Sequence, residues 1–168
     1  MKKILAIAVA AFAFAACGGG NGGSTSSNVE PLKDGVSFET DTYSVMVPTG
    51  MEETFRYENT LNLKTPDGDV KFVINHFTGG PTKSQLKMTG DGLKGMVHAL
   101  DQNCKSDEPK VDGNMVTLRT ITEGNVRLDF TYLKEDKVGV TGNYEFPESQ
   151  AADWEGKFLP ILKSVVFK

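Results

Sequence analysis

The sequence predicts an α+β fold in which an antiparallel β-sheet is packed by a central helix and a C-terminal helix. Seven of the ten alanines lie within residues 1–16, and the rest of the chain is rich in Val, Phe, Thr and Gly, a composition that favours strands. Residues 126–133 alternate apolar and polar side chains, which indicates a strand with one buried face. Residues 86–100 instead repeat apolar side chains at helical spacing.

The N-terminal residues predict a secretory signal followed by a lipid attachment site. A lysine pair precedes the apolar run 4–16, which is too short to span a bilayer because a membrane helix needs roughly 20 residues. The junction 14–17, Phe-Ala-Ala-Cys, resembles the lipobox of bacterial lipoproteins, although Phe14 stands where leucine is usual. The resemblance implies cleavage after residue 16 and acylation of Cys17 with chains such as palmitate. The alternative is an ordinary secreted protein with a chance cysteine.

The segment after the lipid attachment site predicts a flexible tether. Residues 18–28 contain only Gly, Asn, Ser and Thr, and therefore offer no apolar surface to bury. Their root-mean-square span is about 18 Å. The expected organisation is a signal peptide at 1–16, the lipidated cysteine and tether at 17–28, and a single α+β domain at 29–168. No acidic residue follows Cys17 directly, which favours the periplasmic face of the outer membrane in a bacterial cell envelope.

Charge restricts the partners of the domain, and cysteine content restricts how the domain can be stabilised. Without the lysine pair of the signal, sixteen basic and twenty-two acidic residues remain, a net charge of −6. This acidic balance argues against nucleic acid as a partner. If Cys17 carries a lipid, Cys104 is the single remaining thiol, and no intramolecular disulfide forms. Packing is then expected to stabilise the domain.

Two hairpins are expected in the first half of the domain. Their strands are residues 36–39 and 43–47 for the first hairpin, and 61–63 and 70–77 for the second. Pro48 ends the first hairpin, and the turn 66–69 of the second contains Pro and Gly, which suit a tight turn. The stretch between the two hairpins is expected to be irregular.

The central helix is expected to begin near Thr82, which has capping-box spacing to Gln85. Its apolar residues are Leu86, Leu93, Met96, Val97 and Leu100. Three glycines lie within it: Gly90, Gly92 and Gly95. Each glycine costs roughly 1 kcal/mol relative to alanine in a helix. Either residues 89–92 break the helix in two, or close packing on the sheet requires small residues there.

A three-stranded meander and a final helix are expected in the second half. The meander strands are residues 115–122, 126–133 and 137–146, preceded by a polar loop at 105–110. The final helix covers about residues 149–163, with Trp154 as a core anchor and Pro160 expected to kink or end it. A short strand, 165–167, follows.

This order of elements, with the segments 43–48 (Tyr-Ser-Val-Met-Val-Pro), 111–113 (Val-Asp-Gly) and 158–167, resembles the Mog1/PsbP-like fold over residues 35–168. The resemblance implies an α/β sandwich. Members of that group include a nuclear transport factor, an accessory protein of the photosynthetic oxygen-evolving complex and bacterial lipoproteins without assigned activity. The resemblance therefore implies a protein that binds or stabilises something else. Because it rests on element order and not on an active-site motif, no functional residue is transferred from the family to this sequence.

The sequence contains no phosphate-binding loop, Gly-x-Ser-x-Gly, Cys-x-x-Cys or His-Glu-x-x-His motif. We therefore expect a non-enzymatic protein without a metal or other cofactor. The alternative is a periplasmic hydrolase or redox enzyme built from His76, His98 and Cys104, which requires at least two of them to meet in one cleft. His98 and Cys104 are six residues apart, which would place them on opposite faces of a continuing helix.

The polar side chains of the meander are the candidate binding face. They are Arg119, Arg127, Asp129, Thr131, Thr141 and Asn143. If they lie side by side and uncovered, they form a recognition surface for an envelope protein or a small polar ligand. The other interpretation is a solvated sheet face with cross-strand pairs.

Overall fold

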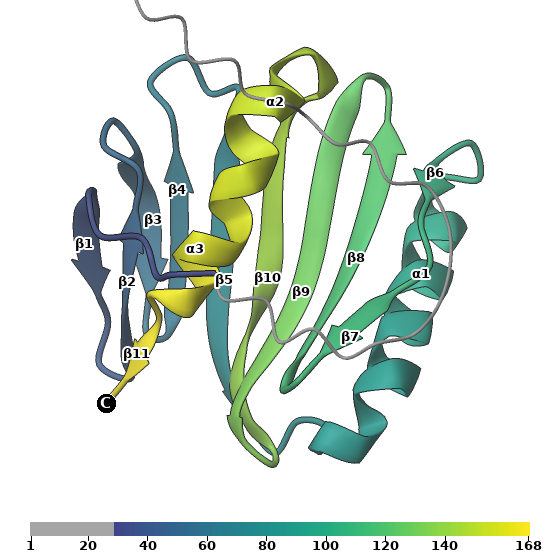
Figure 1. Cartoon of the computed structure of the whole chain (residues 1–168), viewed down its shortest axis with the longest axis horizontal. Coiled ribbons are helices and arrows are strands. Elements are labelled where there is room, and N and C mark those ends of the chain that lie inside the picture. Colours follow the sequence, from purple (N-terminus) through teal and green to yellow (C-terminus); the bar gives the residue numbers. More distant parts are fainter. Residues whose placement is uncertain (1–28) are drawn as a thin grey trace, which may run out of the picture.

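The computed structural model describes residues 29–168, and an eight-stranded antiparallel sheet runs through it (Figure 1). The strand order is β3-β4-β5-β10-β9-β8-β6, with β7 also beside β8. The bounds are β3 Glu52–Tyr57, β4 Thr60–Lys64, β5 Lys71–Thr78, β6 Lys105–Ser106, β7 Lys110–Asp112, β8 Met115–Thr122, β9 Asn125–Glu135 and β10 Val138–Pro147. The predicted signal, Cys17 and tether lie outside the described residues.

A second, three-stranded sheet and short helices complete the fold. The sheet consists of β1 (Val36–Glu39), β2 (Tyr43–Val47) and β11 (Val166–Phe167) in the order β1-β2-β11. The helices are α1 Leu86–Leu100, α2 Ala151–Trp154 and α3 Phe158–Lys163, with the 3₁₀ turns η1 Lys83–Gln85, η2 Glu148–Gln150 and η3 Glu155–Lys157. Within residues 29–168, no helix is both long and apolar enough to cross a bilayer.

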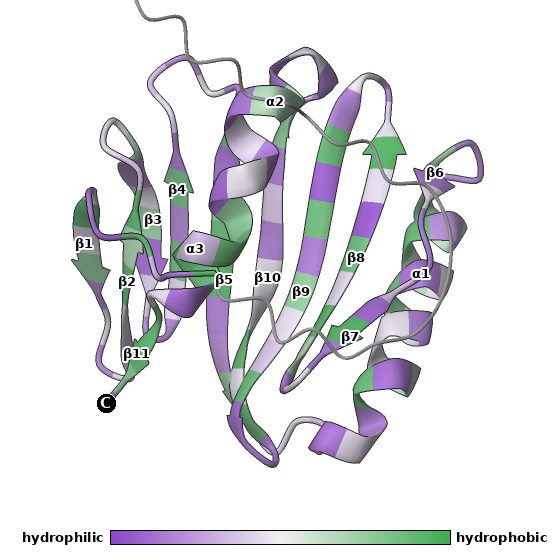
Figure 2. Ribbon diagram, viewed as in Figure 1, coloured by the Kyte–Doolittle hydropathy of each residue, from purple (hydrophilic) through white to green (hydrophobic). Residues whose placement is uncertain are grey.

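The predicted hairpins and meander are confirmed. β1 pairs with β2, β4 pairs with β5, and β8, β9 and β10 are consecutive neighbours, all antiparallel. Alternating hydrophobic and hydrophilic bands run along β9, as its sequence predicts (Figure 2). This alternation gives the large sheet two chemically different faces.

One face of the large sheet carries the main core. Phe72, Phe130, Tyr144 and Phe158 have no more than 4% of their surface exposed, and their rings form a continuous cluster. The first three come from neighbouring strands, whereas Phe158 begins α3. α2 and α3 therefore pack on this face, beside the three-stranded sheet (Figure 1).

α1 packs on the opposite face, over β8. Leu86 contacts Val116, and Val97 contacts Leu118. The register places Leu118 opposite Asp129, so these side chains point away from Phe130 and the main core. The helix is continuous, and at its start the Thr82 amide donates to Gln85 Oε1 at 2.9 Å, consistent with the predicted capping box. The predicted alternative of a break at residues 89–92 is therefore wrong.

The helix glycines provide a test of this packing. A Cβ at Gly90 would lie 2.6 Å from Pro109 Cβ and 2.8 Å from Val116 Cγ2, whereas nothing lies within 4 Å of one at Gly92. We expect Gly90→Ala to lower the free energy of unfolding by about 1–3 kcal/mol through overpacking. Gly92→Ala should raise it by about 0.5–1 kcal/mol, because a helix favours alanine. Urea unfolding of both variants measures this, and changes of the same sign would contradict it.

One local prediction is wrong and another is confirmed only in part, each for an identifiable reason. The stretch expected to be irregular contains β3, an edge strand whose residues are all exposed, so it lacks the alternation that one buried face produces. The final helix is interrupted before Pro160, at η3, in agreement with one of the two outcomes predicted for it. The helix then resumes, and Pro160 lies in the first turn of α3, where a missing N–H is tolerated.

Candidate functional site

The structure places five of the six predicted binding-face residues on one side of the large sheet. Arg127, Asp129 and Thr131 on β9 lie opposite Glu145, Asn143 and Thr141 on β10, respectively. Arg119 instead pairs in register with Leu128, a residue of the main core, and therefore points to the other side. Its inclusion in the predicted face is wrong, because alternation along β8 puts Thr120 beside Arg127.

Arg127 is the centre of a charged network on this face. Its Nε and Nη2 donate to the Asp129 carboxylate at 2.8–3.0 Å, and its Nη1 donates to Glu145 at 2.9 Å. Asp129 is 3% exposed. The hydrogen bonds to Asp129, together with the two negative charges, raise the pKa of Arg127 above its ordinary value. The guanidinium is therefore permanently charged and held in one orientation.

The threonine pair extends the polar row along β9 and β10. The Thr141 hydroxyl donates to the Phe130 carbonyl at 2.7 Å, and its oxygen lies 3.2 Å from that of Thr131. Thr131 is 3% exposed, whereas Thr141 and Asn143 are half-buried. The face therefore fits neither of the two interpretations completely. Its β9 side chains are held by ion pairs and hydrogen bonds, and its half-buried β10 side chains remain accessible.

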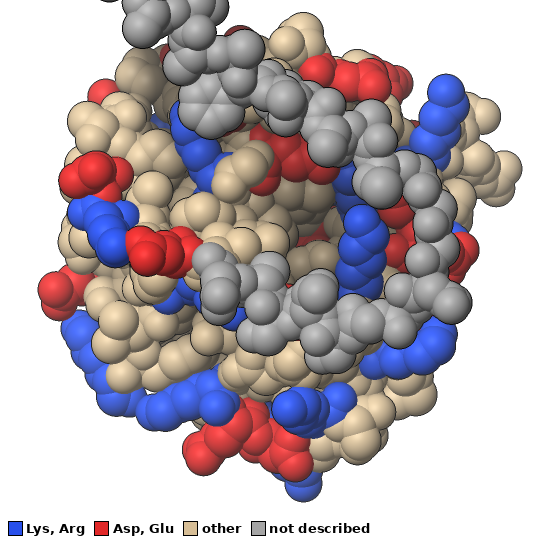
Figure 3. Space-filling model, viewed as in Figure 1, with Lys and Arg blue, Asp and Glu red and all other residues tan. Residues whose placement is uncertain are grey.

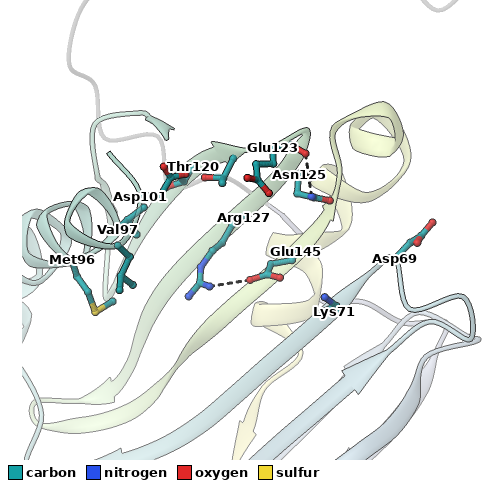
Figure 4. Close-up of a pocket in the computed structure, with 12 residues that line it drawn as sticks. Asp69, Lys71, Met96, Val97, Asp101, Thr120, Glu123, Asn125, Arg127 and Glu145 are labelled. Atoms are coloured by element: carbon teal, nitrogen blue, oxygen red, sulfur yellow. Dashed lines mark hydrogen bonds and ion pairs between the residues drawn. The ribbon is translucent and has the colours of Figure 1, made fainter. Parts of the chain in front are cut away.

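A groove of about 320 Å³ lies where α1 ends over this face. Its lining residues come from α1 and its end, from β8, β9, β10 and β5, and from the turns beside them: Met96, Val97, Leu100, Asp101, Thr120, Thr122, Glu123, Asn125, Arg127, Glu145, Asp69 and Lys71. Figure 4 shows Arg127 reaching across the groove between Glu145 and the α1 residues. The volume is at the lower end of the roughly 300–1,000 Å³ of small-molecule sites.

The groove has an apolar wall and a polar wall. On the α1 side, Met96 is 49% exposed and Leu100 is 83% exposed, although the predicted helical stripe includes both. On the strand side, Thr120 is only 2% exposed, and its Oγ1 has no hydrogen-bond partner among the described residues. The Thr120 oxygen is itself buried beneath the groove surface, so it costs the fold about 1–3 kcal/mol and offers no accessible acceptor to the groove.

The structure brings together two of the three residues of the enzymatic alternative. Cys104 Sγ lies 3.5 Å from His98 Nδ1, and His98 Nε2 lies 2.8 Å from Ser106 Oγ. The expectation that His98 and Cys104 lie on opposite helix faces is wrong, because α1 ends at Leu100 and the chain turns back. The thiol is 6% exposed and packs with Val97 and Leu118.

His76 lies apart from this pair. It occupies the main-core face of β5, opposite Val140, with its ring 6.5 Å from that of Phe167. Burial lowers its pKa, and the charge of Lys134 adds to that shift. Within residues 29–168, no three His, Cys, Asp or Glu side chains are grouped closely enough to hold a metal ion.

A smaller hollow of about 200 Å³ lies on the opposite side of the sheet, between β8 and α3. Arg119 lines it and donates through Nε to Glu155 at 2.8 Å. Acidic and basic side chains are interspersed over the side of the molecule that carries α3 (Figure 3). Arg119 therefore takes part in a local ion pair there and does not contribute to the groove.

Sequence reasoning missed Thr120, Met96 and Leu100 as site residues. Alternation along 115–122 separates Thr120 from Arg119, but the strand register that sets Thr120 beside Arg127 cannot be read from either strand alone. The spacing of Met96, Val97 and Leu100 fits one helical stripe, yet Val97 alone meets the sheet. The sequence signal that could have found Met96 and Leu100 was an apolar stripe wider than its contact with the sheet.

Fold and groove together define an α+β sandwich with a ligand-sized groove on one face. No protein-family model and no curated protein matches the chain. It is similar to cyanobacterial PsbP (CyanoP) from Synechocystis sp. PCC 6803, with a TM-score of 0.59 and 12% identity, over 88% of this chain and 98% of that chain. It is also similar to the Ran-binding protein Mog1p from Saccharomyces cerevisiae, with a TM-score of 0.57 and 9% identity, over 79% and 95%. The chain therefore has the predicted Mog1/PsbP-like fold.

Proposed function

We propose that this protein is a lipid-anchored, non-enzymatic binding module of a bacterial cell envelope, attached through Cys17 to the periplasmic face of the outer membrane. The observation that carries the binding role is the groove, in which exposed apolar side chains of α1 line one wall and charged and polar side chains of the strands line the other. The anchor is supported by the lipobox-like junction 14–17. One of the similar structures is a Ran-binding protein, which is consistent with a fold that presents binding surfaces.

The enzymatic alternative has less support. His76 lies on the main-core face of the sheet, whereas His98 belongs to the helix on the opposite face. Cys104 is buried, and neither it nor His98 lines the groove. A nucleophile must be reachable by its substrate, whereas the Cys104 thiol is packed among core residues beside the half-buried His98.

The anchor is tested by Cys17→Ala. We expect the wild-type chain to fractionate with membranes and the variant to appear in the soluble envelope fraction, because acylation requires the cysteine sulfur. Cys104→Ala is the matched control and should remain with membranes, since its thiol is not the acylation site. Circular dichroism should show the same fold in all three proteins. Membrane retention of Cys17→Ala would refute the anchor.

The binding role is tested by photo-crosslinking in intact cells. A photoreactive residue replaces Leu100, which is 83% exposed in the groove wall, or Val166, which is 61% exposed on β11. We expect adducts of defined mass at position 100 only, whether the bound species is a small molecule or a protein. Equal labelling at both positions would mean that the groove has no particular occupant, and the binding role would then be lost.

A further inference from the structure

We propose that the large sheet carries a second binding surface, which takes a neutral oligosaccharide across β3, β4, β5 and β10. It lies on the α1 side of the sheet, none of its residues lines the groove, and the inference goes beyond the proposed function. Strand register assigns eight side chains to this amide surface, in two parallel rows. The first row is Phe55, Asn62, Val73 and Asn143, and the second is Tyr57, Thr60, Asn75 and Thr141.

The amide surface contains no charged side chain, although 24% of the chain is charged. The next row on the same side of the same strands consists of charged residues alone, two acids and two bases: Glu52, Lys64, Lys71 and Glu145. A solvated sheet face would continue such cross-strand charge pairs. The formal charges of the neighbouring row cancel, so it adds no preference for an ion. The two uncharged rows therefore match a ligand that is itself polar and uncharged.

Asn75 and Asn143 present free amide groups on this surface. Both residues are half-buried, no described residue forms a hydrogen bond with either amide, and neither amide is among the enclosed polar atoms. The Oδ1 of Asn62, by contrast, is enclosed and offers no contact. Asn75 pairs with Thr141, two residues before Asn143, which places the two free amides diagonally about 7–8 Å apart. Each amide donates and accepts at once, as neighbouring hydroxyls of a sugar ring require.

Two aromatic side chains border the amide surface at the edge of the sheet. Phe55 is 50% exposed and Tyr57 is 63% exposed, and they lie beside Asn62 and Thr60. A sugar ring has a rim of hydroxyl groups and an apolar face of C–H groups, and that face packs against the electron-rich face of an aromatic ring. Aromatic rings beside free amides therefore supply both kinds of contact that a sugar makes.

The size and composition of the surface favour a short sugar chain over other uncharged partners. From β3 to β10 it spans three strand spacings, about 14 Å. Val73 is its one aliphatic side chain and is half-buried, which leaves little area for a lipid or another apolar ligand. The cores of protein interfaces concentrate aromatic residues, Met and Arg, whereas amides and hydroxyls occupy the inner strands of this surface.

The test screens the full-length chain, in a detergent without a sugar headgroup, against immobilised hexasaccharides of glucose, mannose and N-acetylglucosamine. Hexagalacturonate is the charged control. We expect at least one neutral hexasaccharide to bind and hexagalacturonate not to bind. Backbone amide NMR shifts caused by the bound sugar should lie on β3, β4, β5 and β10. Its affinity should be equal at about 0.05 M and 0.5 M salt, because salt does not screen contacts with an uncharged ligand.

Variants locate the contacts. Asn143→Ala and Tyr57→Ala should each weaken binding about ten-fold, the effect of losing one well-formed contact. Tyr57→Phe should bind nearly as the wild type, since the ring remains. Asn103→Ala is the matched control for Asn143→Ala, because Asn103 is an exposed asparagine in the turn after α1. Urea unfolding of each variant checks that a loss of binding is not a loss of folding.

Four results would overturn the proposal: no binding of any neutral hexasaccharide, equal binding of hexagalacturonate, shifts outside the amide surface, or equal affinities of Asn143→Ala and Asn103→Ala. These results are distinct from failure of the proposed function, which crosslinking at position 100 reports for the groove alone. Sugar binding without adducts at position 100 would support the amide surface and remove the groove as a site. Adducts at position 100 without sugar binding would do the reverse.

Discussion

Phe130→Ala is expected to remove about 3–5 kcal/mol of folding free energy, the cost of emptying a large aromatic site in a packed core. Phe130 is fully buried, and its ring lies 6.0 Å from that of Phe72 and 5.7 Å from that of Phe158. It therefore joins the large sheet to α3. Because domains of this size have about 5–15 kcal/mol of total stability, the variant should be marginally folded at 37 °C.

Phe55→Ala is the matched control for this prediction. Phe55 lies on the exposed edge strand β3 and is 50% exposed, so the same truncation should cost less than about 1 kcal/mol. Urea unfolding followed by the fluorescence of Trp154, the single tryptophan, reports both losses. Its ring lies 6.5 Å from that of Tyr144 in the same core. Similar losses in the two variants would show that the described core does not stabilise the fold.

Asp129→Asn is expected to cost about 2 kcal/mol, because it leaves the Arg127 guanidinium facing an amide in a buried position. The carboxylate of Asp129 accepts three hydrogen bonds from Arg127. The loss should be smaller than for a fully buried pair, since the Arg127 side chain is 39% exposed and water replaces part of the interaction. Chemical unfolding at neutral pH measures the change.

Glu145→Gln distinguishes the two partners of Arg127. Glu145 accepts one bond at 2.9 Å, and its side chain is 29% exposed. Removing its charge should cost less than about 1 kcal/mol, as for a solvated ion pair. A larger loss for Glu145→Gln than for Asp129→Asn would mean that Asp129 does not orient the guanidinium, and the described network would be wrong.

The strands with one buried face could be predicted because their pattern is local. Residues 126–133 alternate strictly, and Pro48 and the turn 66–69 end their strands for reasons internal to the chain. β3 gave no such signal, since backbone pairing with β4 holds it while both of its faces are exposed. An edge strand of this kind is decided by its neighbour and not by its own side chains.

The candidate site was predicted only in part. Arg127 and Asp129 could be assigned to one face because they are two residues apart on one strand. Arg119 was misplaced because a shift of one residue in register moves a side chain to the other face. Met96 and Leu100 looked like core residues, since helical spacing does not reveal how much of an apolar stripe a partner will cover.

The sequence by itself determined the class of fold, most of the strands, the helix start at Thr82 and the prediction of a lipid anchor at Cys17, because each depends on short-range pattern or composition. Tertiary structure alone decided which side of the sheet each polar residue occupies, the contact between Cys104 and His98, and the groove beside Thr120. The face of each polar residue and the groove arise where segments distant in sequence meet, and their geometry depends on strand register and on where α1 docks. The contact between Cys104 and His98 instead depends on where α1 ends and how the chain turns back after it.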